Sequence, residues 1–264
     1  MTKMCENQDD SAKNGAVSVD SRCLVVVGGV QGLRALCADG WDFSVYELVI
    51  CGDSGQDVAR ALGIVPDVYI GDFDSSPRPA GQTEFADGRT RSPEVLAAVP
   101  ADPTSGAVPG DGAEVIVLPA AKEVTDSEAA VDLAYSRGYR HIDVIGGLGG
   151  RLDHTLGNLG ILAKFAHTPA RLRWIDGYNM VSLVGPGTHT VPRNDYHYFG
   201  LIPFDGDVRG LTLTGTRYLV ENFTLVRGST RGVSNEITGQ FATVSFTSGR
   251  LLMVSSRDLQ ISGQ

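Results

Sequence analysis

Two aspartates after a predicted strand form the densest acidic cluster in the chain. Asp72 and Asp74 lie in the segment Gly71–Ser75, directly after the apolar run at 67–70. Because alternate side chains of an extended segment point the same way, both carboxylates would face one side. Two carboxylates at the carboxyl end of a parallel strand are suited to hold Mg²⁺. The alternative is an aspartate-rich turn without a ligand, and the pair alone does not decide between the two.

A second group of residues lies at a predicted helix start. Thr125 and Asp126 open a helix after the strand at 114–118, and Lys122 lies in the loop before it. The backbone N–H groups of a helix N-terminus, with a hydroxyl and a lysine nearby, are suited to phosphate oxygens. Thr125 and Glu128 also fit the Ser/Thr-x-x-Glu pattern of a helix cap. Taken alone, the group is better explained as a cap.

The glycine-rich segment 146–158 carries a more specific signal. Four glycines precede Arg151, and Asp153 follows two residues later. Glycines let the backbone approach a ligand closely, the arginine offers paired donors to phosphate, and the aspartate offers a metal or hydroxyl partner. The segment matches neither the Gly-x4-Gly-Lys-Ser/Thr phosphate loop nor the Gly-x-Gly-x-x-Gly dinucleotide motif, which fails at Leu152. A structural turn does not need this combination, so we predict a functional loop.

These segments follow strands of one predicted sheet. Five short apolar runs predict strands that are covered on both faces, as in a parallel sheet. They span 23–27, 47–51, 67–70, 114–118 and 141–145. Helix-compatible segments alternate with them at 56–62, 126–136 and 155–167. With Asp53 after the second strand, acidic or glycine-rich loops follow four successive strands at one edge, which is where open α/β sheets bind ligands.

The chain changes character near residue 185. After Gly185 the helical period disappears and alternating segments follow, a pattern typical of half-buried antiparallel strands. We predict the α/β class, with a mostly parallel, Rossmann-like α/β layer over 21–184 and a small all-β sandwich or jelly-roll-like domain over 185–264. The Pro/Gly/Ala-rich segment 76–111 is predicted to be a long surface excursion, and residues 1–20 a flexible tail.

Charge and composition narrow the function classes. The 264 residues include 22 Lys+Arg and 31 Asp+Glu, a net charge of −9. A nucleic-acid partner has no electrostatic support, because phosphate neutralisation needs a basic face. No early apolar run is long enough to span a bilayer, and residues 1–20 lack the apolar core of a signal peptide, so we expect no membrane partner. Four cysteines without a Cys-x-x-Cys pair favour reduced thiols in a cytoplasmic protein.

Five short motifs occur in the order that is typical of thiamin pyrophosphokinases. They are Cys-Gly-Asp-Ser-Gly at 51–55, Gly-Asp-Phe-Asp-Ser at 71–75, Lys-Glu-Val-Thr-Asp at 122–126, Gly-Arg-Leu-Asp-His at 150–154 and Gly-Val-Ser-Asn-Glu at 232–236. Each motif is short, but five in this order, with an α/β half before a β half, are specific. From about residue 23 onward, apart from the excursion, the chain resembles the thiamin pyrophosphokinase family.

The resemblance implies a homodimer with each active site between the α/β domain of one subunit and the β domain of the other. Family enzymes use Mg²⁺ to transfer the terminal diphosphate of ATP to the hydroxyethyl oxygen of thiamin, releasing AMP. The implied metal ligands are Asp72, Asp74 and Asp126. The implied catalytic residues are these three together with Arg151, which would contact the polyphosphate, and Asp153, which would lie near the transferred group. The implied ATP contacts are Asp53, Lys122, Thr125, Arg151, His154 and Asn158.

The implied thiamin contacts, Tyr218, Ser234 and Asn235, lie in the β domain. Two positions depart from the family pattern. The family usually has Asp-Gly-Gly where this chain has Asp-Ser-Gly at 53–55, and some members have a stacking tryptophan where Tyr218 is the nearest match. Tyrosine keeps an aromatic face for stacking.

Two other function classes stay open at this point. A Mg²⁺-dependent phosphohydrolase could use the same carboxylates, but it would release phosphate without thiamin. A non-catalytic thiamin or nucleotide sensor could retain the scaffold, but loss of catalysis should remove the metal carboxylates first. Asp72, Asp74, Asp126 and Asp153 are all present, so we favour diphosphate transfer from ATP to thiamin.

Overall fold

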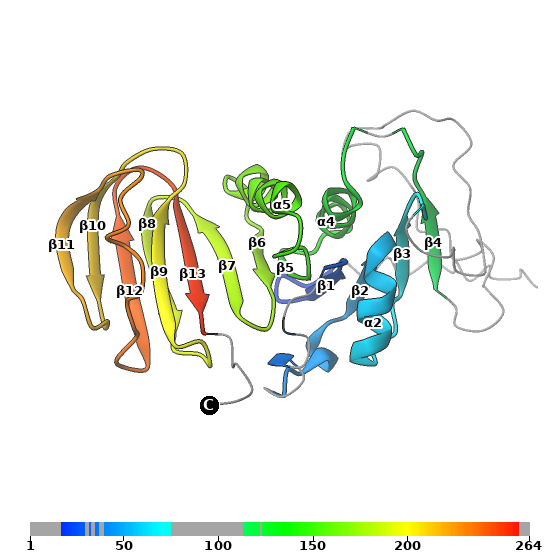
Figure 1. The fold of residues 1–264 in the computed structure, drawn as a ribbon, viewed down its shortest axis with the longest axis horizontal. Coiled ribbons are helices and arrows are strands. Elements are labelled where there is room, and N and C mark those ends of the chain that lie inside the picture. Colours follow the sequence, from blue (N-terminus) through cyan, green and yellow to red (C-terminus); the bar gives the residue numbers. More distant parts are fainter. Residues whose placement is uncertain are drawn as a thin grey trace, which may run out of the picture.

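The computed structural model describes residues 17–29, 32, 35–36, 40–74, 113–121 and 123–258. The predicted excursion 76–111 and most of the predicted tail lie outside these ranges. Within them, one nine-stranded and one four-stranded sheet form the fold (Figure 1). No helix of this part of the chain has the length and apolar character needed to cross a membrane.

The large sheet begins with six parallel strands. In spatial order they are β4 (Glu114–Val117), β3 (Val68–Gly71), β2 (Leu48–Gly52), β1 (Arg22–Val26), β5 (His141–Ile145) and β6 (Arg171–Ile175). Val25 of β1 lies between Ile50 and Val144 of its two neighbours. Almost every residue of β1, β2 and β5 is buried, as the continuous apolar runs predict. The strand order changes direction at β1, so the crevice beside it is the expected ligand position.

Helices cover both faces of these parallel strands. The three labelled helices are α2 (Gln56–Leu62), α4 (Asp126–Ser136) and α5 (Leu152–Phe165). One apolar core lies under α4 and α5, and a second lies on the opposite face under α2 (Figure 1). The predicted bounds of α2 and α4 are confirmed. The third helix begins at Leu152 and not at 155, so Arg151 caps it and Asp153 lies in its first turn.

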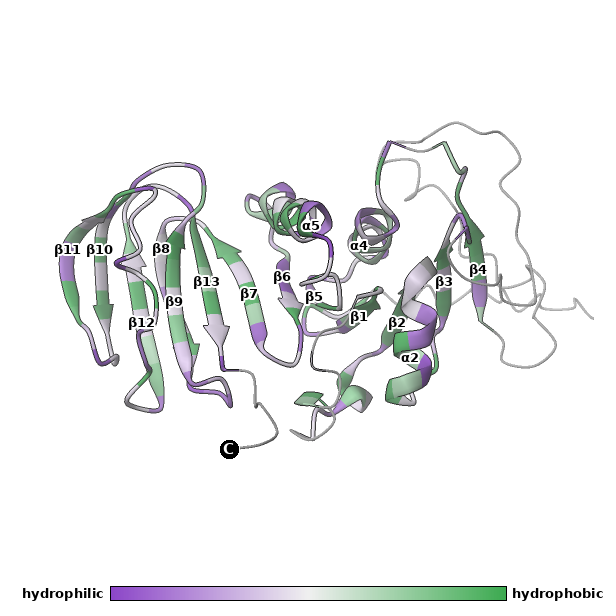
Figure 2. Ribbon diagram, in the orientation of Figure 1, coloured by the Kyte–Doolittle hydropathy of each residue, from purple (hydrophilic) through white to green (hydrophobic). Residues whose placement is uncertain are grey.

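Three antiparallel strands extend the large sheet, and a second sheet packs on them. The extension consists of β7 (Asn179–Val184), β13 (Leu251–Ser256) and β9 (Tyr198–Pro203). The four-stranded sheet consists of β11 (Val220–Leu225), β10 (Val208–Thr214), β12 (Phe241–Phe246) and β8 (Gly187–Pro192). Its strands alternate between hydrophobic and hydrophilic residues (Figure 2). Its apolar face meets β9 and β13 in a third core that includes Phe199, Val244 and Leu251.

The predicted fold class, an α/β layer followed by a β sandwich, is confirmed. One layer of the sandwich is the end of the large sheet, which runs without a break past the domain boundary predicted at 184/185. The division into domains at that boundary stays a prediction.

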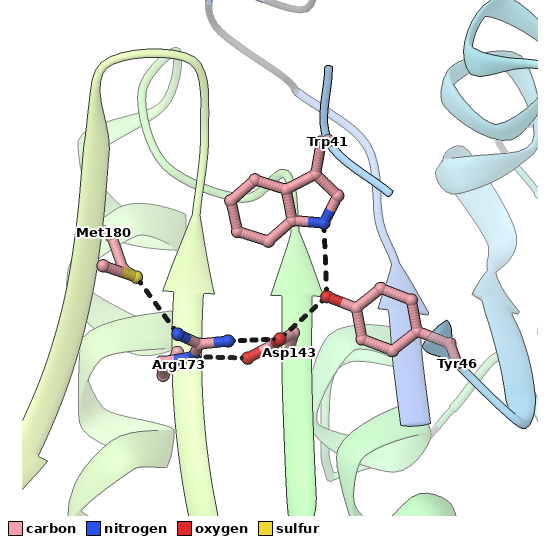
Figure 3. Close-up of polar contacts among 5 residues, drawn as sticks. All are labelled: Trp41, Tyr46, Asp143, Arg173 and Met180. Atoms are coloured by element: carbon pink, nitrogen blue, oxygen red, sulfur yellow. Dashed lines mark hydrogen bonds and ion pairs between the residues drawn. The ribbon is translucent and has the colours of Figure 1, made fainter. Parts of the chain in front are cut away.

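A polar network is buried on the α2 side of the sheet (Figure 3). The Asp143 carboxylate accepts hydrogen bonds from Arg173 Nε (2.7 Å) and Nη2 (2.6 Å) and from the Tyr46 hydroxyl (2.8 Å). Trp41 Nε1 donates to the Tyr46 hydroxyl (3.3 Å) and Arg173 Nη1 contacts Met180 Sδ (3.5 Å). Burial, and then the Asp143 charge, raise the pKa of Tyr46 above its ordinary value, so the phenol stays a donor.

Breaking this network should destabilise the fold. The Asp143 side chain is 6% exposed, so Arg173→Met would leave a buried carboxylate without its cation. Because Arg173 itself is 38% exposed, we expect a loss of about 2–3 kcal/mol in the free energy of unfolding, below the range for a fully buried pair. Urea denaturation measures this loss. Arg60→Met, which breaks the exposed Arg60–Asp57 pair, is the matched control and should change stability little. Equal midpoints for the two variants would contradict the assignment.

Candidate active site

The loops after β1, β2 and β5 pack together at the carboxyl ends of the central strands. The Gly147 N–H donates to the Gly28 carbonyl (2.8 Å). A side chain at Gly28 would overlap Ser54, in the loop after β2. A side chain at Gly52 would begin 3.9 Å from the Asp126 Cβ. The predicted functional loops and the start of α4 therefore meet at the strand-order reversal.

The acidic loop after β3 is a turn. Asp72 is half-buried, Asp74 is exposed, and the Asp74 N–H donates to Asp72 Oδ1 (3.4 Å). Phe73 between them has a left-handed φ of 55°. The sequence interpretation assumed an extended segment, and that assumption is wrong. The two carboxylates still lie within one turn of chain, at the end of the strand next to β2.

The start of α4 confirms the predicted helix cap. The Thr125 hydroxyl accepts a hydrogen bond from the Glu128 N–H (3.2 Å), and Asp126 lies in the first helical turn. A carboxylate in this turn is favoured by the helix dipole. The predicted ATP contacts Lys122 and the side chain of Asp53 lie outside the described part of the chain.

The glycine-rich loop leads into two exposed, oppositely charged side chains, Arg151 and Asp153. Gly146, Gly147, Gly149 and Gly150 all have positive φ values, between 69° and 95°, a conformation that favours glycine. The loop ends at α5, where Arg151 Nη2 and Nε donate to the Asp153 carboxylate at 2.6 and 3.2 Å. The two side chains are 73% and 64% exposed, so both can reach a ligand.

The pairing with Arg151 also lowers the pKa of Asp153. The hydrogen bond from Arg151 holds the pKa of the Asp153 carboxyl below its ordinary value, and the N–H of His154 donates to the same carboxylate (3.0 Å). Asp153 therefore remains a hydrogen-bond acceptor at neutral pH. The same pairing raises the pKa of Arg151.

Two buried side chains donate hydrogen bonds to backbone carbonyls of the glycine-rich loop. Asn158 Nδ2 donates to the Gly147 carbonyl (2.8 Å), and Trp174 Nε1 donates to the Gly146 carbonyl (2.6 Å). Asn158 was predicted as an ATP contact, and the structure places its amide against the loop backbone. Trp174 was not a candidate, because it lies outside the glycine-rich motif and its contact with the loop arises only in the fold.

The three candidate thiamin residues lie together in the β half. The side chain of Asn235 is hydrogen bonded to the backbone of Tyr218, and Ser234 has a left-handed φ of 59°. The Tyr218 side chain is exposed. A cavity of about 330 Å³ is formed mainly by the loop before β9 and by Glu236 and Ile237, which follow Asn235 in the chain; none of the three candidate residues lines it.

The acidic and the β-half residues are not brought together within one chain. Asn235 pairs with β9 through the Phe199 N–H (2.7 Å), and Asp72 follows β3. Seven strand spacings separate β3 from β9 in the large sheet, which at roughly 4.8 Å per strand is about 34 Å. Figure 1 places β3 and the β10–β11 pair toward opposite ends of the long axis.

No preformed metal cage is present among the residues that the structure describes: no three His, Cys, Asp or Glu side chains gather closely enough to hold an ion. Mg²⁺ does not require such a cage, because it is usually bound through one or two carboxylates together with water and substrate phosphates. The paired carboxylates of Asp72 and Asp74 fit that mode of binding.

Comparisons with known proteins match both the α/β half and the β half of the chain to the same family. The families described as "Thiamin pyrophosphokinase, catalytic domain" and "Thiamin pyrophosphokinase, vitamin B1 binding domain" match residues 43–173 and 188–251. The thiamine pyrophosphokinase of Bacillus subtilis is 33% identical over 214 residues, 81% of this chain and 89% of that protein.

Solved structures agree with the sequence matches. A crystal structure of the Bacillus subtilis thiamine pyrophosphokinase has a TM-score of 0.67 at 30% identity, covering 90% of this chain and 100% of its own. A thiamin pyrophosphokinase from Geobacillus thermodenitrificans has a TM-score of 0.66 at 32% identity, with 90% and 99% covered. With both halves matched in sequence and in fold, the chain belongs to the thiamin pyrophosphokinase family.

Proposed function

We propose that this chain transfers the diphosphate of ATP to the hydroxyl of thiamin and releases AMP, at a site built from two copies of the chain. Family membership supports the reaction. The observation that carries the proposal is the convergence of the three loops and the start of α4 at the strand-order reversal, with the Arg151–Asp153 pair exposed at the start of α5. The comparisons do not favour the phosphohydrolase or the non-catalytic sensor.

The polyphosphate is assigned to the region between the glycine loop and the helix starts. Arg151 presents a planar fork with a permanent positive charge, and the first turns of α4 and α5 offer backbone N–H groups. Both kinds of donor recognise phosphate oxygens. Phosphoryl-type transfer depends mainly on positioning and charge stabilisation, which these groups can provide. Thr125 and His154 border the same region.

Mg²⁺ is assigned to Asp72 and Asp74. Asp126, beside Gly52, is the third candidate ligand, although the structure does not gather it with the other two carboxylates. When bound, the ion would neutralise charge on the phosphate oxygens. The turn at Phe73 brings the backbone N–H of Asp74 to the Asp72 carboxylate. Asp153, whose exposed carboxylate is ionised at neutral pH, would accept a hydrogen bond from the thiamin hydroxyl and so orient it toward the β-phosphorus.

Two copies are needed because the halves of the site are too far apart in one chain. A bond-forming step requires reacting atoms about 3–3.5 Å apart, whereas β3 and β9 are separated by roughly 34 Å across the sheet. A partner subunit's β half can supply Tyr218 and Ser234 to the acidic loops, in an arrangement with two equivalent contacts. We also place the enzyme in the cytoplasm, which is supported by Cys23 and Cys51 being buried free thiols.

A coupled assay of AMP release tests the reaction. With Mg²⁺ and ATP present, AMP should form in strict one-to-one proportion to the thiamin added, and no inorganic phosphate should accumulate. Hydroxyl compounds without the thiamin rings serve as acceptor controls and should give no AMP. Phosphate release in the absence of thiamin would instead support the phosphohydrolase.

A further inference from the structure

The side chain of Asn235 holds the backbone of Tyr218 on both sides. The Tyr218 N–H donates to Asn235 Oδ1 (3.0 Å), and Asn235 Nδ2 donates to the Tyr218 carbonyl (2.8 Å). The Glu236 N–H donates to the same Oδ1 (2.9 Å). Asn235 is 7% exposed. The amide oxygen already accepts two hydrogen bonds and the amide nitrogen already donates one, so most of the hydrogen-bonding capacity of this side chain is used within the protein.

A second side chain fixes the same segment. The hydroxyl of Thr216, which is 5% exposed, donates to the Tyr218 carbonyl (3.0 Å). Arg217 forms an ion pair with Glu236 (2.8 Å), and its guanidinium lies 5.5 Å from the centre of the Tyr218 ring. The backbone of Tyr218 is therefore hydrogen bonded to Asn235, and its neighbour Arg217 is paired with Glu236.

The Asn235 segment is itself anchored to the sheet. The Phe199 N–H donates to the Asn235 carbonyl (2.7 Å), and the Leu201 N–H donates to the Gly232 carbonyl (2.8 Å). Ser234 lies between these two anchors in a left-handed conformation, which a non-glycine residue adopts only where its surroundings impose it. The segment is a rigid base for Tyr218.

The Tyr218 ring, in contrast, is free of the core. The residue is 59% exposed, and Leu219 next to it is 65% exposed. The backbone of Tyr218 is already fixed and its side chain has only two χ angles to order, so the ring can bind a flat ligand at low entropic cost.

We propose that Asn235 is a positioning residue, which fixes Tyr218 so that its ring forms a platform for an aromatic ring of thiamin. The inference rests on the proposed function, because it takes thiamin as the ligand. It differs from the role implied by family resemblance, in which Asn235 itself faces thiamin. Supporting groups of this kind decide how accurately a contacting side chain is held.

A double-mutant cycle in the full-length enzyme tests the proposal. Asn235→Ala should raise the KM for thiamin by roughly ten-fold, as loss of a buried hydrogen-bonded group predicts. Tyr218→Ala should raise it by about as much, because it removes the stacking ring. If Asn235 acts through Tyr218, the double variant should have the same KM as Tyr218→Ala alone. The KM for ATP should not change. Multiplied effects in the double variant would show an independent contact between Asn235 and thiamin, and would overturn the proposal.

Conservative and matched variants guard against a folding defect. Asn235→Asp keeps the oxygen that accepts from Tyr218 but turns a carboxylate oxygen toward the Tyr218 carbonyl, where Nδ2 now donates. The two oxygens repel, so its KM for thiamin should rise at least as much as in Asn235→Ala. Asn179→Ala removes an amide that holds the turn at Asp176, far along the chain, and should leave the KM for thiamin unchanged. An equal rise in Asn179→Ala would make the Asn235 effect a general loss of stability and would overturn the proposal.

Hydrogen exchange measured without substrate separates this inference from the proposed function. Asn235→Ala should speed amide exchange in the peptide that contains Tyr218, because that N–H loses its acceptor, and should not speed exchange in α4. Unchanged exchange at Tyr218 would overturn the positioning role even in an active enzyme. Absence of thiamin-dependent AMP release in the wild type would instead overturn the proposed function.

Discussion

Asp74→Asn should lower thiamin-dependent AMP release by roughly 100- to 1,000-fold, the range expected when a group that stabilises transition-state charge is removed. The amide keeps the shape of the side chain but cannot supply the negative charge that Mg²⁺ requires. Asp74 is exposed and follows Asp72 after a single residue, so the substitution changes no residue of the buried core. The steady-state rate at saturating Mg²⁺ and ATP measures the effect.

The fold of this variant should be intact. Two adjacent carboxylates repel each other in the absence of a cation, so the melting temperature without Mg²⁺ should be unchanged or slightly higher. The stabilisation that Mg²⁺-ATP gives to the wild type should be lost. Asp57→Asn, on the exposed face of α2, is the matched control and should keep full activity. Near-normal turnover of Asp74→Asn would contradict the assignment of the carboxylate pair.

Arg151→Lys should reduce kcat by roughly ten- to a thousand-fold. Lysine keeps the positive charge but cannot make the two-pronged contact that Arg151 makes with Asp153 through Nε and Nη2. The remaining N–H donors of the guanidinium are those we assign to the transferred diphosphate, and their loss would leave transition-state charge poorly held.

Steady-state kinetics with ATP and with thiamin show whether Arg151→Lys changes kcat or the KM of one substrate. The decrease should appear mainly in kcat. Arg60→Lys changes an arginine that is paired with an aspartate on an exposed helix surface, and should have no kinetic effect. If the change in Arg151→Lys were confined to the KM for thiamin, Arg151 would belong to the other substrate.

The sequence predicts the α/β half well because each of its elements carries a local signal. Strands such as β5 are mostly apolar runs between helices, and α4 begins at a Thr125 cap whose hydrogen bond is present. The large sheet could not be predicted in full. β13 pairs with β7 although more than sixty residues separate them, and an alternating pattern does not say which sheet a strand joins.

The candidate site likewise contains residues that the sequence indicates and residues that it does not. Residue type and spacing indicate Arg151 and Asp153, and the structure pairs them. The left-handed φ of Phe73 carries no sequence signal, since the residue is not a glycine. The supporting roles of Trp174 and Asn235 depend on contacts across the fold, so motif reading alone could not reveal them.

The claim that each active site needs two subunits is tested most directly by mixing two inactive variants. Asp74→Asn damages the acidic loop, and Ser234→Trp blocks the β half. If sites are shared, an exchanged heterodimer has one site with both lesions and one site with neither. Random pairing in an equal mixture should then restore up to about a quarter of wild-type activity. If the mixture stays inactive after subunit exchange has been verified by native mass spectrometry, each chain builds its own site and the shared-site account is contradicted.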